Sequence, residues 1–138
     1  MDVAGLNGFS RRFFEFLQER GPDLASLAEV DHSHAWAPGT LTLRVAENLS
    51  LSTLNDELTV FFESMHVHLD DFERALELLS EIQNETTLCA EWLCGDELLS
   101  SSLTHREPLA RPFQLTKPTR VRLRSFHGTF DEVRELEP

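Results

Sequence analysis

The chain has 138 residues, of which 41% are hydrophobic and 26% charged, so it is large enough to bury a core and too apolar to be disordered. Its 24 acidic residues outnumber its 12 basic residues and give a formal net charge of −12. Such a surface repels nucleic-acid phosphates and attracts basic proteins. No apolar run is long enough to cross a bilayer, and the N-terminus lacks a signal segment, so we expect a cytoplasmic protein without membrane association.

The first third of the chain predicts one clear helix. Residues 9–20 carry apolar side chains at helical spacing, and Gly21 and Pro22 end the pattern. A short second helical turn is predicted in residues 23–30, followed by a loop that contains Pro38 and Gly39.

The centre of the chain predicts two strands and a second helix. Apolar and polar residues alternate over 40–47, which indicates a half-buried strand, and residues 48–55 are expected to turn the chain. A longer strand is predicted over 56–69, with a break near Ser64. A helix over 71–83 follows, capped by Asp70 or Asp71.

The last third predicts three more strands. Residues 86–95 and 97–105 are expected to form a hairpin, residues 107–118 a long loop, and residues 119–130 the last strand. An acidic tail or short helix is predicted for residues 131–137.

Together these elements predict a single α+β domain over residues 1–138. Because most connections are short, we expect an antiparallel sheet of about five strands with two main helices packed on one face. The helix of residues 9–20 precedes the sheet and second helix, which occupy residues 40–130. The predicted core residues, each on the apolar side of its element, are Leu43, Val60, Leu76, Leu79 and Val121.

Two histidines and an aspartate alternate in the stretch ESMHVHLDD. On a strand His66, His68 and Asp70 would share a face and could bind one zinc ion, with a fourth ligand from the pair His32 and His34. The alternative is that the histidines lie at the edge of a groove, where they bond to neighbouring groups or contact a partner. The absence of a His-Glu-x-x-His helix or paired Cys-x-x-Cys motifs favours this alternative, so no metal or other cofactor is expected.

No nucleophilic site is indicated. The serines of residues 100–102 lie near His105, but no Gly-x-Ser-x-Gly turn accompanies them. Cys89 and Cys94 are too few for a disulfide framework, and Cys89 is expected to pack as a small hydrophobic residue. We therefore expect that the protein is not an enzyme.

Arg120, Arg122 and Arg124 alternate on the last predicted strand and share one face. They could bind an anion, or they could pair with acids of adjacent strands such as Glu57, Glu63 or Glu91, which the acidic composition favours. Of the two tryptophans, Trp92 is expected in the core and Trp36, in a loop, is the candidate for partner contact.

Two motifs stand out in the second half of the chain: the His-x-His-x-Asp pattern of residues 66–70, which ends a predicted strand before a helix, and the stretch RSFHGTFD of residues 124–131. With these motifs this half of the chain resembles immunity proteins encoded beside secreted polymorphic toxins of bacteria. It covers about the last eighty residues and brings no catalytic residues. It implies neutralisation of a cognate toxin by binding.

The sequence thus favours a binding protein for a basic partner, with a toxin as the partner that the resemblance implies. A metal-dependent enzyme or metal sensor using His66, His68 and Asp70 is the first alternative, and a generic adaptor domain is the second. The oligomeric state is not indicated. The residues expected to contact the partner are His66, His68, Asp70, Asp71, Glu73 and Trp36.

Overall fold

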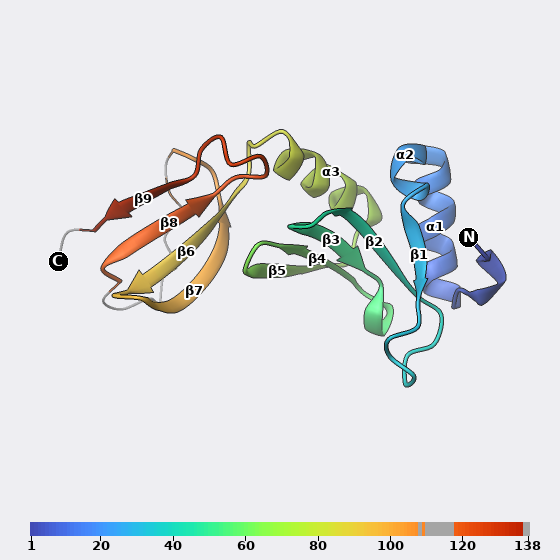
Figure 1. The fold of residues 1–138 in the computed structure, drawn as a ribbon. Coiled ribbons are helices and arrows are strands. Elements are labelled where there is room, and N and C mark those ends of the chain that lie inside the picture. The colour runs from blue at the N-terminus through green and yellow to red at the C-terminus, as the bar shows by residue number, and fades with distance from the viewer. Residues whose placement is uncertain (108, 110–117, 137–138) are drawn as a thin grey trace. The chain divides into compact units, whose positions relative to one another are not determined.

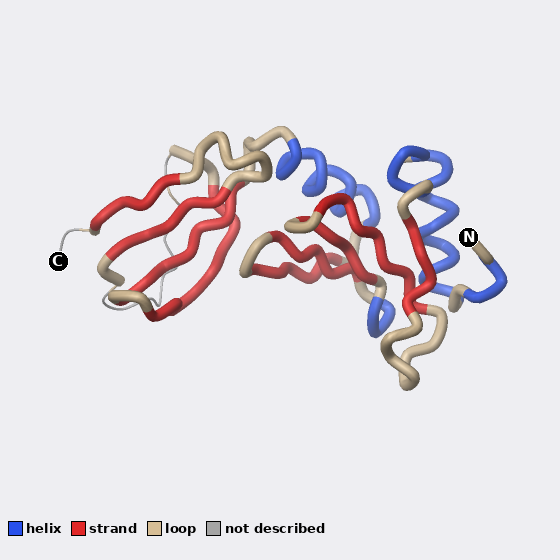
Figure 2. The backbone as a smooth tube through the Cα atoms, in the orientation of Figure 1, coloured by secondary structure: helices blue, strands red, loops and turns tan. Residues whose placement is uncertain are grey.

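The computed structural model describes residues 1–107, 109 and 118–136, and these form the α+β fold that the sequence predicts. The helices and strands are drawn in Figure 1, and Figure 2 separates them by type. Two antiparallel sheets are present within these residues, one with the strand order β1-β2-β3-β4-β5 and one with the order β7-β6-β8-β9. The elements are α1 (Gly8–Arg20), α2 (Pro22–Ala25), β1 (Ala28–Asp31), β2 (Thr40–Ala46), β3 (Leu49–Ser52), β4 (Leu58–Phe62), β5 (Met65–Leu69), α3 (Phe72–Gln83), β6 (Leu88–Cys94), β7 (Glu97–Thr104), β8 (Arg120–Arg124) and β9 (Glu132–Glu135).

The chain divides into two compact units. The first unit comprises Met1–Phe61 and Val67–Glu77, and the second comprises Phe62–His66 and Leu78–Pro138. Each unit has buried hydrophobic residues of its own, such as Phe13 in the first and Trp92 in the second. The prediction of one domain stays a prediction, which unfolding experiments can test.

Helix α1 is fixed at its start by a capping residue and a turn distant in sequence. The side chain of Asn7 accepts a hydrogen bond from the backbone N–H of Ser10 at 2.8 Å, as an N-cap residue does. The backbone N–H of Asn7 donates to the carbonyl oxygen of Gly39 at 3.0 Å. Gly39 has φ = +77°, and a Cβ atom there would overlap the Asn7 backbone, so only glycine fits this position.

The buried side of α1 packs in the first unit. Phe13 and Leu17 are completely buried, as are Leu41, Leu43 and Leu51 of the sheet. The hydroxyls of Ser10 and Thr53 lie 2.6 Å apart in this interior, so both buried polar groups have a partner.

The predicted break near Ser64 is confirmed. The stretch forms two strands, β4 and β5, and Glu63 between them adopts the left-handed conformation with φ = +53°. Asp71 caps α3, because its carboxylate accepts the backbone N–H of Glu73 at 2.8 Å.

The sheet of the second unit is built around β6. The side chains of Leu88, Ala90 and Trp92 pack with Val121 and Leu123 of β8 in one buried cluster. The indole N–H of Trp92 donates to the Ser102 hydroxyl at 3.3 Å, which satisfies the polar atom of the ring. The prediction that Trp92 is a core residue is therefore confirmed.

Some predicted element boundaries were wrong. Residues 48–55 contain strand β3, whose side chains alternate between buried and half-buried. The helical turn predicted for residues 23–30 is the four-residue helix Pro22–Ala25, and β1 begins at Ala28. A tail or helix was predicted for residues 131–137, but Glu132–Glu135 form strand β9, because they pair with β8. Strand β8 ends at Arg124, where the turn of Ser125 to Gly128 begins. The loop predicted for 107–118 lies largely outside the described residues.

The predicted core is confirmed in four of its five positions. Leu43, Val60, Leu79 and Val121 are at most 1% exposed, whereas Leu76 is half-buried. The buried line of α3 runs through its neighbours Ala75, Leu78, Leu79 and Ile82, so Leu76 lies at the margin. Within the part of the chain that the structure describes, no helix has the length and apolar character needed to span a membrane.

Candidate functional site

An acid-rimmed aromatic surface lies in the first unit, where α1 meets the start of α3. Two adjoining hollows of about 380 and 600 Å³ share Phe9 and Asp70 in their linings. We call this the acidic–aromatic surface and define it by the residues that line the two hollows: Phe9, Phe16, Asp56, Glu57, His68, Leu69, Asp70, Asp71, Phe72 and Glu73.

The floor of this surface is a cluster of phenylalanines. Phe72, at the start of α3, meets Phe9 and Phe16 of α1 with ring centroids 5.7 and 5.5 Å apart. It also meets the fully buried Phe13 at 5.1 Å, edge to face. Phe9, Phe16 and Phe72 themselves are only half-buried. The cluster therefore anchors the two helices together and leaves aromatic surface in the hollows.

Several acids of the rim are exposed to solvent and are also bonded to other residues of the chain. Asp71 caps α3, and Glu73 forms an ion pair with Arg20 of α1, in which the two side chains are 48% and 52% exposed. The Nδ1 atom of His68 lies 2.9 Å from Glu57 and 3.0 Å from the Thr59 hydroxyl. Asp70 is exposed and lines both hollows. The rim is therefore held in place and still open to solvent.

The structure brings four of the six predicted contact residues to this surface. His68, Asp70, Asp71 and Glu73 line it. His66 is exposed on β5 but is not part of either lining. Trp36 lies in the loop between β1 and β2, where it is 66% exposed and its ring contacts His34 at 5.3 Å between centroids.

The alternative metal site would need His66, His68 and Asp70 to converge on one ion. Among the described residues, no group of three or more histidine, cysteine, aspartate or glutamate side chains is arranged to hold a metal ion. The Nδ1 atom of His68 faces Thr59 and Glu57. His68 therefore bonds to neighbouring groups, as in the alternative to a zinc site that the sequence favours.

The arginines of β8 pair with acids as the composition favoured. Glu91 of β6 lies opposite Arg122, and its Oε1 accepts hydrogen bonds from Arg122 at 2.6 Å and Arg124 at 3.4 Å. Arg120 binds Asp96 at 2.6 Å. Burial acts to raise the pKa of the Glu91 carboxyl, but the hydrogen bonds from Arg122, Ser64 and Arg124 outweigh it and lower this pKa. This cluster is a satisfied ion-pair network of the second unit.

Cys89 is not an activated nucleophile. Cys89 is completely buried, and burial raises the pKa of its thiol to about 11, so the thiol is protonated at neutral pH. The Ser64 hydroxyl lies 3.9 Å from its sulfur atom. Cys89 therefore packs as the hydrophobic residue that its strand position predicts.

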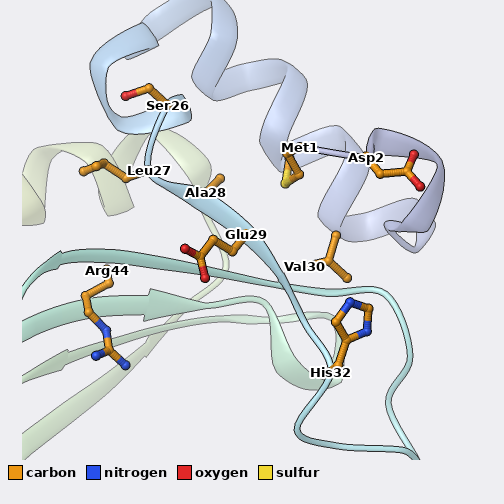
Figure 3. Close-up of a pocket in the computed structure, with 9 residues that line it drawn as sticks. All are labelled: Met1, Asp2, Ser26, Leu27, Ala28, Glu29, Val30, His32 and Arg44. Carbon is orange, nitrogen blue, oxygen red and sulfur yellow. The ribbon is translucent and has the colours of Figure 1, made fainter.

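A third hollow of the first unit lies beside β1. It has a volume of about 660 Å³ and is lined by the N-terminus, β1 and Arg44 of β2, as Figure 3 shows. Its charged residues are of both signs, with Asp2 and Glu29 against Arg44, and its apolar lining includes Met1 and Leu27. This hollow contains none of the predicted contact residues.

The aromatic floor and two acids of the rim are not among the residues that the sequence predicts as contacts. The sequence predicts Phe9 and Phe16 only as apolar residues of a helix, and Asp56 and Glu57 only as the start of a strand. One signal was available. The phenylalanines of α1 cover a wider arc than one buried face needs, since Phe13, Phe14 and Leu17 already fill that face.

Comparison with protein families, curated proteins and solved structures finds no match to this chain.

Proposed function

We propose that this protein is an immunity protein that neutralises a basic effector toxin in the bacterial cytoplasm by binding it directly. The observation that carries the proposal is the acidic–aromatic surface, where half-exposed phenylalanines are surrounded by carboxylates. Apolar area contributes affinity in a protein interface, and an arrangement of charge selects a partner of opposite sign. The link to toxins comes from the resemblance of residues 66–70 and 124–131.

The net charge of −12 supports the same proposal. An excess of one sign accelerates encounter with a partner of the opposite sign, and this speed matters for an inhibitor that must bind before a toxin acts. The surface would then hold the encountered partner through its aromatic floor.

The test is co-expression of this chain with the product of the neighbouring gene, scored by growth. The partner alone should stop growth, and this protein should restore it. The triple variant Asp56→Asn, Glu57→Gln, Asp70→Asn should protect less, because it removes three negative charges from the rim. Asparagine also tolerates the positive φ of residue 56.

The matched control removes three exposed acids elsewhere, in the triple variant Glu47→Gln, Glu97→Gln, Glu135→Gln. It has the same net charge and should protect nearly as well as the unchanged protein. Equal loss of protection by both variants would show that total charge matters and the acidic–aromatic surface does not. A neighbouring product that is harmless, or kills equally with and without this protein, would leave the adaptor alternative.

A further inference from the structure

The acidic–aromatic surface already holds a guanidinium group of its own chain. Arg20, in the last turn of α1, forms an ion pair with Glu73, and its Nη2 donates to the Oε2 of that residue at 3.1 Å. The guanidinium carbon of Arg20 also lies 5.8 Å from the centre of the Phe16 ring. One arginine therefore uses both components of the surface, a carboxylate of the rim and an aromatic ring of the floor.

A second arginine of α1 repeats the aromatic half of this arrangement. The guanidinium carbon of Arg12 lies 5.9 Å from the centre of the Phe9 ring. Guanidinium groups are attracted to aromatic faces and form paired hydrogen bonds with carboxylates, so the two contacts identify the ligand chemistry that the surface suits.

The Arg20 contact is open to competition. Both side chains of the pair are about half exposed, and a half-exposed ion pair contributes little to stability and exchanges its partners readily. The neighbouring Asp70 is exposed beside Phe72 and has its carboxylate available to a second cation.

We propose that the acidic–aromatic surface binds arginine side chains of the partner and that Arg20 is their internal competitor. The inference rests on the proposed function, because it names the partner groups that the same surface would take. In the complex an arginine of the partner occupies Glu73 and the face of Phe16, and Arg20 moves out into solvent. A partner segment rich in arginine fits better than one rich in lysine, because the ring contact and the paired hydrogen bonds need a planar guanidinium.

The experiment measures binding of a fluorescent peptide of alternating arginine and glycine, with a peptide in which citrulline replaces arginine as the neutral control. Arg20→Gln should tighten binding of the arginine peptide by roughly two- to fivefold, since it releases a weak exposed pair. Arg44→Gln makes the same change in net charge on β2 and should have a clearly smaller effect. The citrulline peptide should bind weakly to every variant.

Further variants separate the ring from the charge. Phe16→Leu keeps an apolar side chain but removes the aromatic face, and Glu73→Gln removes the carboxylate, so each should weaken binding of the arginine peptide. Thermal unfolding monitors the fold. If Arg20→Gln lowers the midpoint of thermal unfolding, Arg20→Lys is used in its place. Lysine keeps the positive charge but lacks the planar guanidinium. This variant too should tighten binding.

Equal effects of the substitutions at Arg20 and Arg44, or weaker binding after loss of Arg20, would overturn this inference. So would equal binding of the arginine and citrulline peptides. Either result with intact growth protection would leave the proposed function in place. Lack of protection in the co-expression assay would instead overturn the proposed function, whatever the peptide measurements gave.

Discussion

Glu91 of the second unit and the acids of the acidic–aromatic surface in the first unit are held in opposite ways. In the second unit Glu91 is 5% exposed and accepts hydrogen bonds from two arginines of the adjacent strand. In the first unit the acids around the phenylalanine cluster remain open to solvent, and the ion pair between Arg20 and Glu73 is half exposed. A buried carboxylate needs a cation from its own chain, whereas an exposed carboxylate can attract a cation from another molecule. The comparison therefore separates charge that supports the fold from charge that is available for binding.

The largest expected effect tests whether the two units unfold separately. Phe13→Ala in the first unit and Trp92→Ala in the second should each lower the free energy of unfolding by about 3–5 kcal/mol, because each removes a completely buried aromatic side chain. Calorimetry measures the transitions. If the units are independent, each variant shifts a different transition. A single transition that both variants shift would support the predicted single domain.

The next effect concerns the buried carboxylate. Glu91→Gln should lower the free energy of unfolding by about 2–3 kcal/mol, since it weakens charged hydrogen bonds, removes the anion that pairs with Arg122 and leaves Arg124 with Asp131 alone. Glu73→Gln should cost at most about 1 kcal/mol, because its pair is exposed. Urea unfolding at neutral pH measures both. Equal costs for the two substitutions would remove the distinction between the units.

The same residue should make stability depend on acidity. The folded structure lowers the pKa of Glu91 below its ordinary value of 4.5, so the unfolded chain takes up a proton at higher pH than the folded chain. The stabilisation by Glu91 is therefore complete above about pH 5 and is lost as the pH falls through 4.5 to the lower folded pKa.

A pH series of urea unfolding tests this expectation. The loss of stability below about pH 5 should be smaller in Glu91→Gln, which has no proton to bind at this position. Glu97→Gln is the control, since its side chain is exposed on the same sheet. If Glu91→Gln and Glu97→Gln have the same acid profile as the unchanged protein, the buried pair is not the source.

The smallest expected effect on stability is at the acidic–aromatic surface. Asp70→Asn should change the free energy of unfolding by no more than about 0.5 kcal/mol, because the residue is exposed. It should nevertheless slow association with a basic partner, and added salt should slow the unchanged protein more than the variant. Stopped-flow mixing at several salt concentrations measures this. Identical salt dependence in the two proteins would show that Asp70 does not steer the partner.

The elements with strong periodicity could be predicted from the sequence. Residues 9–20 and 71–83 repeat apolar side chains at helical spacing, and both are helices in the structure. The alternating pattern of residues 40–47 likewise predicts strand β2, and the chain breaks between β4 and β5 near the predicted position of Ser64. The local sequence is sufficient for helices and strands of this kind, because the spacing of their apolar residues identifies the face that is buried.

Other segments depend on partners that local sequence does not reveal. Strand β9 has acidic residues that suggest a tail, but its backbone pairs with β8, where Arg120 lies opposite Glu135. Strand β3 consists of four residues that also fit a turn, and it is a strand because β2 lies beside it. Pairing between strands decides both cases.

Only the part of the candidate site that is close together in the sequence could be predicted. His68, Asp70, Asp71 and Glu73 are close in sequence, so their proximity follows from the end of one strand and the start of one helix. Phe9 and Phe16 reach the same place from a helix more than fifty residues earlier. That meeting depends on tertiary packing against Phe72, which no local pattern shows.

The turn at Gly39 has a consequence for the recognition of related sequences. Its backbone holds Asn7 at the start of α1, and any side chain at residue 39 would overlap that residue. A relative that keeps this arrangement should therefore pair glycine at position 39 with asparagine, aspartate, serine or threonine at position 7. The two positions are 32 residues apart in the printed chain. This residue pair should therefore identify relatives even where their surface residues have diverged.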